Sequence, residues 1–151
     1  ASGEDISSVI GEGTEELPDV VDECYYIDEE GVIFQEALLS RGFLITIIRD
    51  YENYPDLRVG MRPFSHEDTR FILETKNHLK TELSSLGVKE FLYEGGEVTV
   101  VTDMGWRIFL NRSYGPAKNV AVIKEILKKN EGSAVISDYL DLRITNKVYY
   151  K

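Results

Sequence analysis

The residue types that most often carry enzymatic chemistry are scarce in this sequence. Its histidines are His66 and His78, and its single cysteine is Cys24. A catalytic triad needs a histidine that is held by an acid and placed near a nucleophile. The two histidines lie on one predicted helix, separated by about 18 Å along its axis, so they cannot share a metal ion. We therefore expect no catalytic residue, no metal and no cofactor, and hence a protein that is not an enzyme.

Three other patterns have ordinary structural interpretations. Gly11-Glu12-Gly13 has no strand before it and acids around it, unlike a phosphate-binding loop. Glu94 and Glu97 flank Gly95-Gly96, which is typical of a hairpin turn with solvated acids rather than of a catalytic carboxylate pair. Trp106 and the tyrosines could stack on sugars or single-stranded nucleic acid, but the basic groove of such a site is missing. We expect these aromatic residues to pack in the core or on the sheet.

Composition and charge narrow the class of protein further. The chain has 151 residues, of which 42% are hydrophobic, enough for one globular core. Residues 1–23 hold eight acids and no base, whereas the remainder holds 19 acids and 17 bases. The expected domains are therefore an acidic tail over residues 1–23, which contributes little to stability, and a nearly neutral folded domain over 24–151. Neither nucleic acid nor an anionic membrane surface is an expected partner. The chain has no run of apolar residues that would span a membrane.

The hydrophobic pattern predicts eight strands and two helices. Ser65 is a favoured N-cap for the first helix, Gly87 a stop for it, and Pro116 a favoured first-turn residue for the second. Adjacent strands with few helices between them favour an α+β fold, with a mostly antiparallel sheet and two helices packed on one face. The predicted strands cover residues 24–27, 32–34, 43–48, 88–93, 98–102, 106–111, 134–144 and 147–151, and the helices 65–86 and 116–130.

Several segments, taken in order, resemble the extracytoplasmic β domain of the bacterial cell-division proteins FtsQ and DivIB. Residues 24–34, CYYIDEEGVIF, are similar to the family's opening hairpin, with its Tyr-x-Asp-x-x-Gly pattern and closing Phe. Residues 105–110, GWRIFL, are similar to a central strand of that domain. Residues 139–144, YLDLRI, followed by 147–151, KVYYK, resemble its closing pair of strands.

This resemblance implies a non-catalytic scaffold that binds FtsB-type and FtsL-type partners through its C-terminal strands during septum formation. It also implies a location outside the cell membrane, on a protein anchored by one upstream transmembrane helix and carrying a POTRA domain. Residues 1–23 are too few for a POTRA domain, so they are either a flexible tail or a remnant of one. The expected partner-binding residues are Arg143, Ile144, Asn146, Lys147, Val148, Tyr149 and Tyr150.

Strand alternation makes a sharper prediction for the last part of the chain. Leu140, Leu142 and Ile144 should face the helices, which leaves Asp141 and Arg143 on the outer face of the sheet. The resemblance implies that Arg143 pairs with a glutamate of the partner. The alternative is a simple surface ion pair between Arg143 and Asp141, and the two interpretations are compatible. The competing function is a ligand-binding module or enzyme, such as a binder of cell-wall glycan that uses Trp106.

Overall fold

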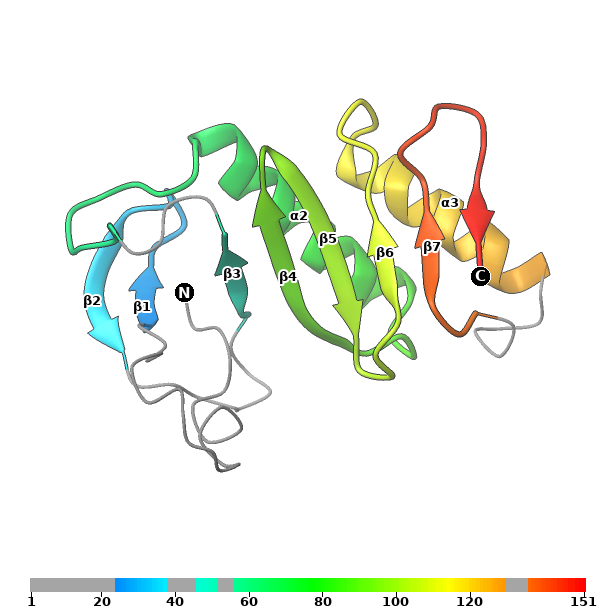
Figure 1. The fold of residues 1–151 in the computed structure, drawn as a ribbon, viewed down its shortest axis with the longest axis horizontal. Coiled ribbons are helices and arrows are strands. Elements are labelled where there is room, and N and C mark those ends of the chain that lie inside the picture. Colours follow the sequence, from blue (N-terminus) through cyan, green and yellow to red (C-terminus); the bar gives the residue numbers. More distant parts are fainter. Residues whose placement is uncertain (1–23, 38–45, 52–55, 130–135) are drawn as a thin grey trace, which may run out of the picture.

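The computed structural model describes residues 24–37, 46–51, 56–129 and 136–151. The predicted tail and the ends of two predicted strands, residues 43–45 and 134–135, lie outside the described residues. Within them the elements follow the predicted order (Figure 1). They are β1 (Cys24–Ile27), β2 (Ile33–Ala37), β3 (Ile48–Asp50), α2 (His66–Glu82), β4 (Val88–Glu94), β5 (Glu97–Thr102), β6 (Arg107–Phe109), α3 (Pro116–Lys129), β7 (Tyr139–Asp141) and β8 (Tyr149–Tyr150).

The strands form two sheets, and the larger one is mixed. In the described part of the chain, β1 pairs with β2, and the larger sheet has the order β3-β4-β5-β6-β7-β8. The pairs β3–β4 and β6–β7 are parallel, and the other three pairs of that sheet are antiparallel. The fold is α+β, but the expectation of a mostly antiparallel sheet is wrong for this one. Each helix connects two neighbouring strands, and such a crossover returns the chain to the end where it started, which makes the strands parallel.

Both helices begin where the sequence predicts. The hydroxyl of Ser65 accepts a hydrogen bond from the backbone N–H of Asp68 at 3.0 Å, so it caps α2. The helix ends at Glu82, earlier than predicted, because the chain leaves helical geometry at Leu83 and makes one further turn before Gly87. The observed bounds of α3 agree with the prediction to within one residue.

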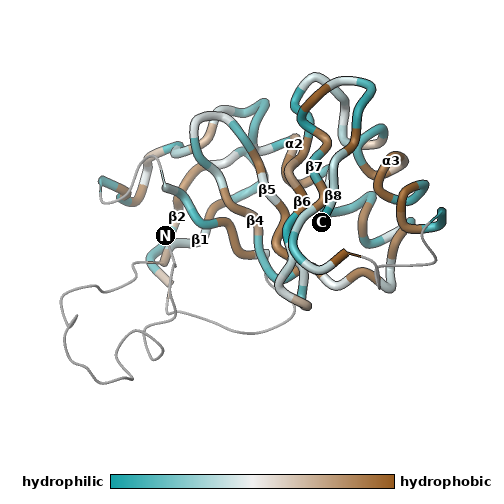
Figure 2. Tube along the Cα trace, turned by 45° about the vertical axis from the view of Figure 1, so that its right-hand side comes forward, coloured by the Kyte–Doolittle hydropathy of each residue, from teal (hydrophilic) through white to brown (hydrophobic). Residues whose placement is uncertain are grey.

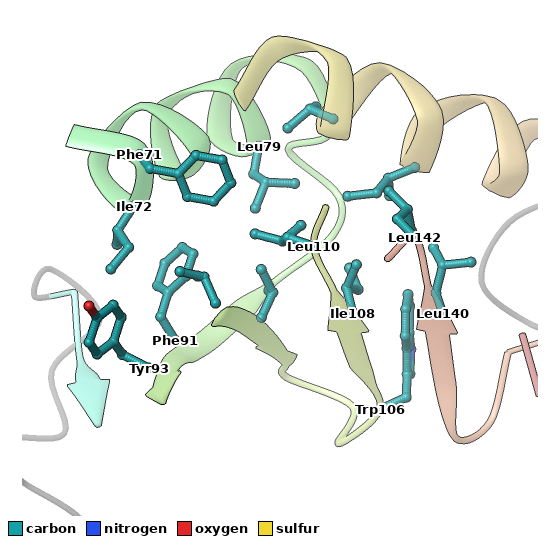
Figure 3. Close-up of a cluster of buried hydrophobic side chains, with 14 of the residues drawn as sticks. Phe71, Ile72, Leu79, Phe91, Tyr93, Trp106, Ile108, Leu110, Leu140 and Leu142 are labelled. Carbon is teal, nitrogen blue, oxygen red and sulfur yellow. The ribbon is translucent and has the colours of Figure 1, made fainter. Parts of the chain in front are cut away.

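The core lies between the helices and one face of the larger sheet (Figure 3). Phe91 on β4, Ile108 on β6 and Leu140 on β7 contribute side chains to it, and each is 0% exposed. Ile72 of α2 and Ile123 of α3 cover them and are also fully buried. Hydrophobic positions occur along both helices and the strands of the larger sheet (Figure 2). Burial of each large apolar side chain contributes about 1.5–3 kcal/mol. One face of the sheet is thereby closed by the helices.

The hairpin β1–β2 lies beside the β3 end of the larger sheet (Figure 1). Its turn forms as predicted: the carboxylate of Asp28 accepts hydrogen bonds from the backbone N–H groups of Glu30 and Val32, both at 2.9 Å. Gly31 adopts a φ of 87° in this turn. A Cβ atom there would lie 2.5 Å from the hydroxyl of Thr69, so glycine also allows the turn to approach α2 closely.

Candidate partner-binding site

The face of the larger sheet opposite the helices carries a row of side chains that crosses every strand. The row follows from the register, because directly paired residues point to the same side of a sheet. Its members are Arg49, Leu92, Thr99, Phe109, Asp141 and Tyr149. Arg49 at one end forms an ion pair with Glu90 at 2.7 Å. We call this side of the sheet the outer face.

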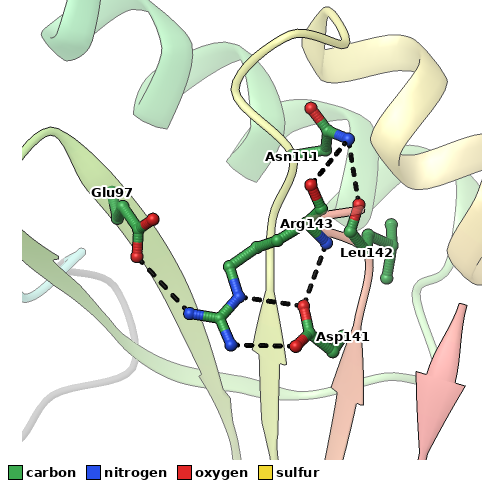
Figure 4. Close-up of polar contacts among 5 residues, drawn as sticks. All are labelled: Glu97, Asn111, Asp141, Leu142 and Arg143. Atoms are coloured by element: carbon green, nitrogen blue, oxygen red, sulfur yellow. Dashed lines mark hydrogen bonds and ion pairs between the residues drawn. The ribbon is translucent and has the colours of Figure 1, made fainter. Parts of the chain in front are cut away.

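Arg143 lies over the outer face, where its side chain contacts Asp141, Phe109 and Glu97 (Figure 4). Its Nε and Nη2 donate hydrogen bonds to the two carboxylate oxygens of Asp141, at 2.9 and 2.8 Å. Its guanidinium carbon lies 4.4 Å from the centre of the Phe109 ring, a cation–π contact. A looser ion pair joins Nη1 to Glu97 at 3.5 Å. The planar fork is therefore oriented on its own sheet before any partner is present.

The charges in this pair reinforce one another. Hydrogen bonds from the Arg143 side chain hold the pKa of Asp141 below its ordinary value, and they outweigh the opposite effect of burial. The hydrogen bonds to Asp141 likewise raise the pKa of Arg143. Both groups are consequently charged at neutral pH. The surface pair expected as one interpretation of Arg143 is present, and the partner contact stays a prediction.

A concavity of about 410 Å³ lies next to Arg143 on the outer face. It is lined by Tyr51, Leu92, Glu94, Glu97, Thr99, Arg107, Phe109 and Arg143. Half of these residues are charged, with two carboxylates and two guanidinium groups, so the lining differs from the mostly apolar pocket typical of a small-molecule site. Trp106 takes no part in it. Its side chain is 3% exposed in the core, which confirms the packing interpretation and removes it as a stacking platform for sugar.

The seven predicted partner-binding residues lie on the C-terminal hairpin, but the orientation of Ile144 differs from the prediction. Leu140 and Leu142 are buried, as predicted. Ile144 is 51% exposed, so the expectation that it faces the helices is wrong. The regular alternation stops after Leu142, because a turn begins at Ile144, whose carbonyl accepts a hydrogen bond from the N–H of Lys147.

The remaining predicted residues lie within this turn or after it. Asn146 is in the turn and has a φ of 66°. Its backbone N–H donates a hydrogen bond to the hydroxyl of Tyr114 at 3.2 Å. Val148 is half-buried against the core, while Tyr149 and Tyr150 are 48% and 45% exposed. Of the two expected positions for these tyrosines, the core and the sheet surface, they occupy the sheet surface. β8 is the last strand in the order of the sheet and pairs with β7.

Two buried asparagines position the start of this hairpin. The side-chain amide of Asn111, 3% exposed, donates to the carbonyl of Leu142 at 3.0 Å and to that of Arg143 at 3.4 Å. Asn119, at 0% exposed, accepts from the backbone N–H of Asn111 and donates to its carbonyl, both at 2.9 Å. The backbone of Arg143 is in this way tied to the first turn of α3.

Glu97 and Phe109 are site residues that the sequence interpretation missed. Glu97 was expected to be a solvated turn residue, and the nearby Arg143 comes from a distant part of the chain. The outward direction of Phe109 could have been found from alternation, because it is two residues from Arg107 and next to the buried Ile108. The strand order that brings all of them together carries no local sequence signal.

The two histidines lie on α2, away from the C-terminal hairpin. His66 begins α2, and His78 pairs with Glu82 one turn away at 2.8 Å. Across residues 24–37, 46–51, 56–129 and 136–151, no group of three or more His, Cys, Asp or Glu side chains could hold a metal ion. Of the helices that the structure describes, neither has the length and apolar character needed to cross a membrane. No known protein family matches this sequence, and no curated protein matches it either.

Proposed function

We propose that this chain is a non-catalytic scaffold domain of the FtsQ/DivIB type, which binds FtsB-type and FtsL-type partners during bacterial septum formation. The observation that carries the proposal is the C-terminal hairpin. It joins an oriented arginine, Arg143, to β8, the edge strand among those that the structure describes, within one short segment. An edge strand can pair with an extended peptide through the backbone, while a preoriented guanidinium selects a carboxylate.

Two further features support this proposal. The side chains of Ile144, Tyr149 and Tyr150 on this hairpin are exposed, and aromatic residues of this kind are enriched where proteins meet. The resemblance to the FtsQ/DivIB β domain covers the same segment. It also implies that the domain acts outside the cell membrane, on a protein with an upstream membrane anchor. The competing function as a glycan binder loses its main residue, because Trp106 is buried.

The test is a calorimetric titration of the C-terminal segment of the FtsB-type protein from the same genome. We expect binding to the wild-type domain, and about 30-fold weaker binding to Arg143→Ala, because loss of one member of a desolvated charge pair costs about 2 kcal/mol or more. Circular dichroism should show an intact fold. Arg70→Ala is the matched control, since Arg70 forms an exposed ion pair with Glu74 on α2 and should bind the segment like wild type.

Backbone pairing requires a separate measurement. In an antiparallel ladder, consecutive residues direct their N–H groups to opposite sides. Lys151 and Tyr139 exchange hydrogen bonds with each other, so alternate amides of β8 are directed away from β7. Partner binding along β8 should slow hydrogen exchange within this strand. Failure of the wild-type domain to bind would refute the proposed function, whereas equal affinities of wild type and Arg143→Ala would remove Arg143 from the site.

A further inference from the structure

The two carboxylates beside Arg143 are held very differently. The side chain of Asp141 is 17% exposed and accepts hydrogen bonds from Nε, from Nη2 and from the backbone N–H of Arg143. The side chain of Glu97 is 61% exposed and lies 3.5 Å from Nη1, beyond the usual length of a hydrogen bond between charged groups. Asp141 is therefore a fixed part of the site, and Glu97 is a loosely held counter-ion.

The contacts of Arg143 leave one edge of the guanidinium available to a ligand. A guanidinium has five N–H donors in a fixed plane. Asp141 occupies the edge formed by Nε and Nη2, and Phe109 lies against one face of the plane. The edge that includes Nη1 remains, and Glu97 lies beside it (Figure 4). Glu97 also lines the concavity. An incoming acceptor has to approach where Glu97 now lies.

We propose that Glu97 is an internal competitor for this edge of Arg143, and that a partner's carboxylate side chain binds Arg143 by displacing it. The inference rests on the proposed function and adds a specificity-determining residue to that site. Complementary charge identifies the occupant: an edge already balanced by a loosely bound carboxylate accepts another carboxylate. A cationic or neutral group placed there would leave this edge of Arg143 without a carboxylate.

A partner's carboxylate has two advantages over Glu97. A segment that is anchored along β8 and continues across the outer face would bring its side chain to Arg143 at a high effective concentration. It would also cover the edge of the guanidinium and exclude water, which strengthens the attraction between the charges. The exposed Glu97 has neither advantage, because water and salt screen its ion pair with Arg143.

The proposal predicts a gain in affinity from loss of a charge. Glu97→Gln should bind the FtsB-type segment about three-fold more tightly than wild type, the factor expected when a surface ion pair no longer has to be broken. Glu74→Gln removes the same charge from α2, within another surface ion pair, and should leave the affinity unchanged. Equal affinity of Glu97→Gln and wild type, or weaker binding by Glu97→Gln, would overturn the proposal.

A second experiment separates this inference from the proposed function, because it needs no protein partner. The NMR signal of the Arg143 Nε–H group is followed while sodium acetate is added, with sodium chloride as the control for ionic strength. We expect acetate to shift this signal at a lower concentration in Glu97→Gln than in wild type. If the two proteins respond alike, or neither responds, the competitor role is wrong, whatever the partner segment does. If acetate behaves as expected and the segment does not bind, only the proposed function fails.

Discussion

A partly buried ion pair on the helix side of the sheet, between Arg112 and Asp68, should make a substantial electrostatic contribution to stability. Arg112 follows β6 and donates from Nη2 to the carboxylate of Asp68 on α2 at 2.6 Å. Its other terminal nitrogen donates to the carbonyl of Gly96, and its guanidinium lies 4.3 Å from the centre of the Phe71 ring. The hydroxyl of Tyr93 donates to the second oxygen of Asp68 at 2.5 Å. The cluster joins α2, β4, the β4–β5 turn and the segment before α3.

The cost of replacing Arg112 with methionine can be bounded from its exposure. The side chains of Arg112 and Asp68 are 26% and 15% exposed. Breaking a fully buried pair costs about 3–5 kcal/mol, and breaking an exposed pair at most about 1 kcal/mol. We expect Arg112→Met to lie between these limits, at about 2 kcal/mol. The methionine retains apolar contact with Phe71, so the loss measures mainly the charge and hydrogen bonds.

Thermal unfolding at neutral pH should show this loss as a fall in Tm of about 7 °C. The double variant Arg112→Met/Asp68→Asn should be more stable than the sum of the two single changes predicts, by about 1 kcal/mol, because it leaves no buried carboxylate without a cation. These comparisons require the same unfolding transition in all four proteins.

The same pair predicts a dependence of stability on pH. Burial raises the pKa of Asp68, but hydrogen bonds from Tyr93 and Arg112 outweigh burial and hold it below the ordinary value of 3.8. A lowered pKa in the folded state means that the stabilisation is present above the unfolded pKa and is lost as pH falls through the folded one. The difference in stability between wild type and Asp68→Asn should therefore narrow below pH 3.8. The reasoning would be refuted by two results together: a fall in Tm of only about one degree for Arg112→Met, and a stability difference between wild type and Asp68→Asn that does not change at acidic pH.

Two further changes test local features of the fold. Gly31→Ala should lower the free energy of unfolding in urea by about 2 kcal/mol, because the new Cβ combines a φ of 87° with a contact of 2.5 Å to Thr69. Gly60→Ala has a φ of 92° but open space around it, so it should lower the free energy by only about 1 kcal/mol. Equal losses would show that the approach to α2 is unimportant. Asn119→Ala should lower the free energy of unfolding by about 2–3 kcal/mol, because the buried N–H and carbonyl of Asn111 lose their hydrogen bonds to this side chain. A loss below about 0.5 kcal/mol in the same assay would mean that water replaces the amide.

The order of the elements could be predicted from the sequence because its signals are local. The N-cap Ser65, the turn glycine Gly31 and the first-turn Pro116 each act within a few residues of their own position. The burial of Leu140 and Leu142 followed from alternation within one strand. Such signals do not depend on where the rest of the chain lies.

The candidate site depends on which strands become neighbours, and only the tertiary structure decided that. Glu97 on β5 and Phe109 on β6 reach Arg143 because β5, β6 and β7 are adjacent, and β6 and β7 are adjacent because α3 crosses over between them. Pairing between strands is set by the summed burial of a whole sheet face, not by any short segment. Ile144 shows the limit of alternation: its orientation changed because a turn begins at this residue. The sequence determined the residues that each element contributes, and the packing of α3 determined which of them meet.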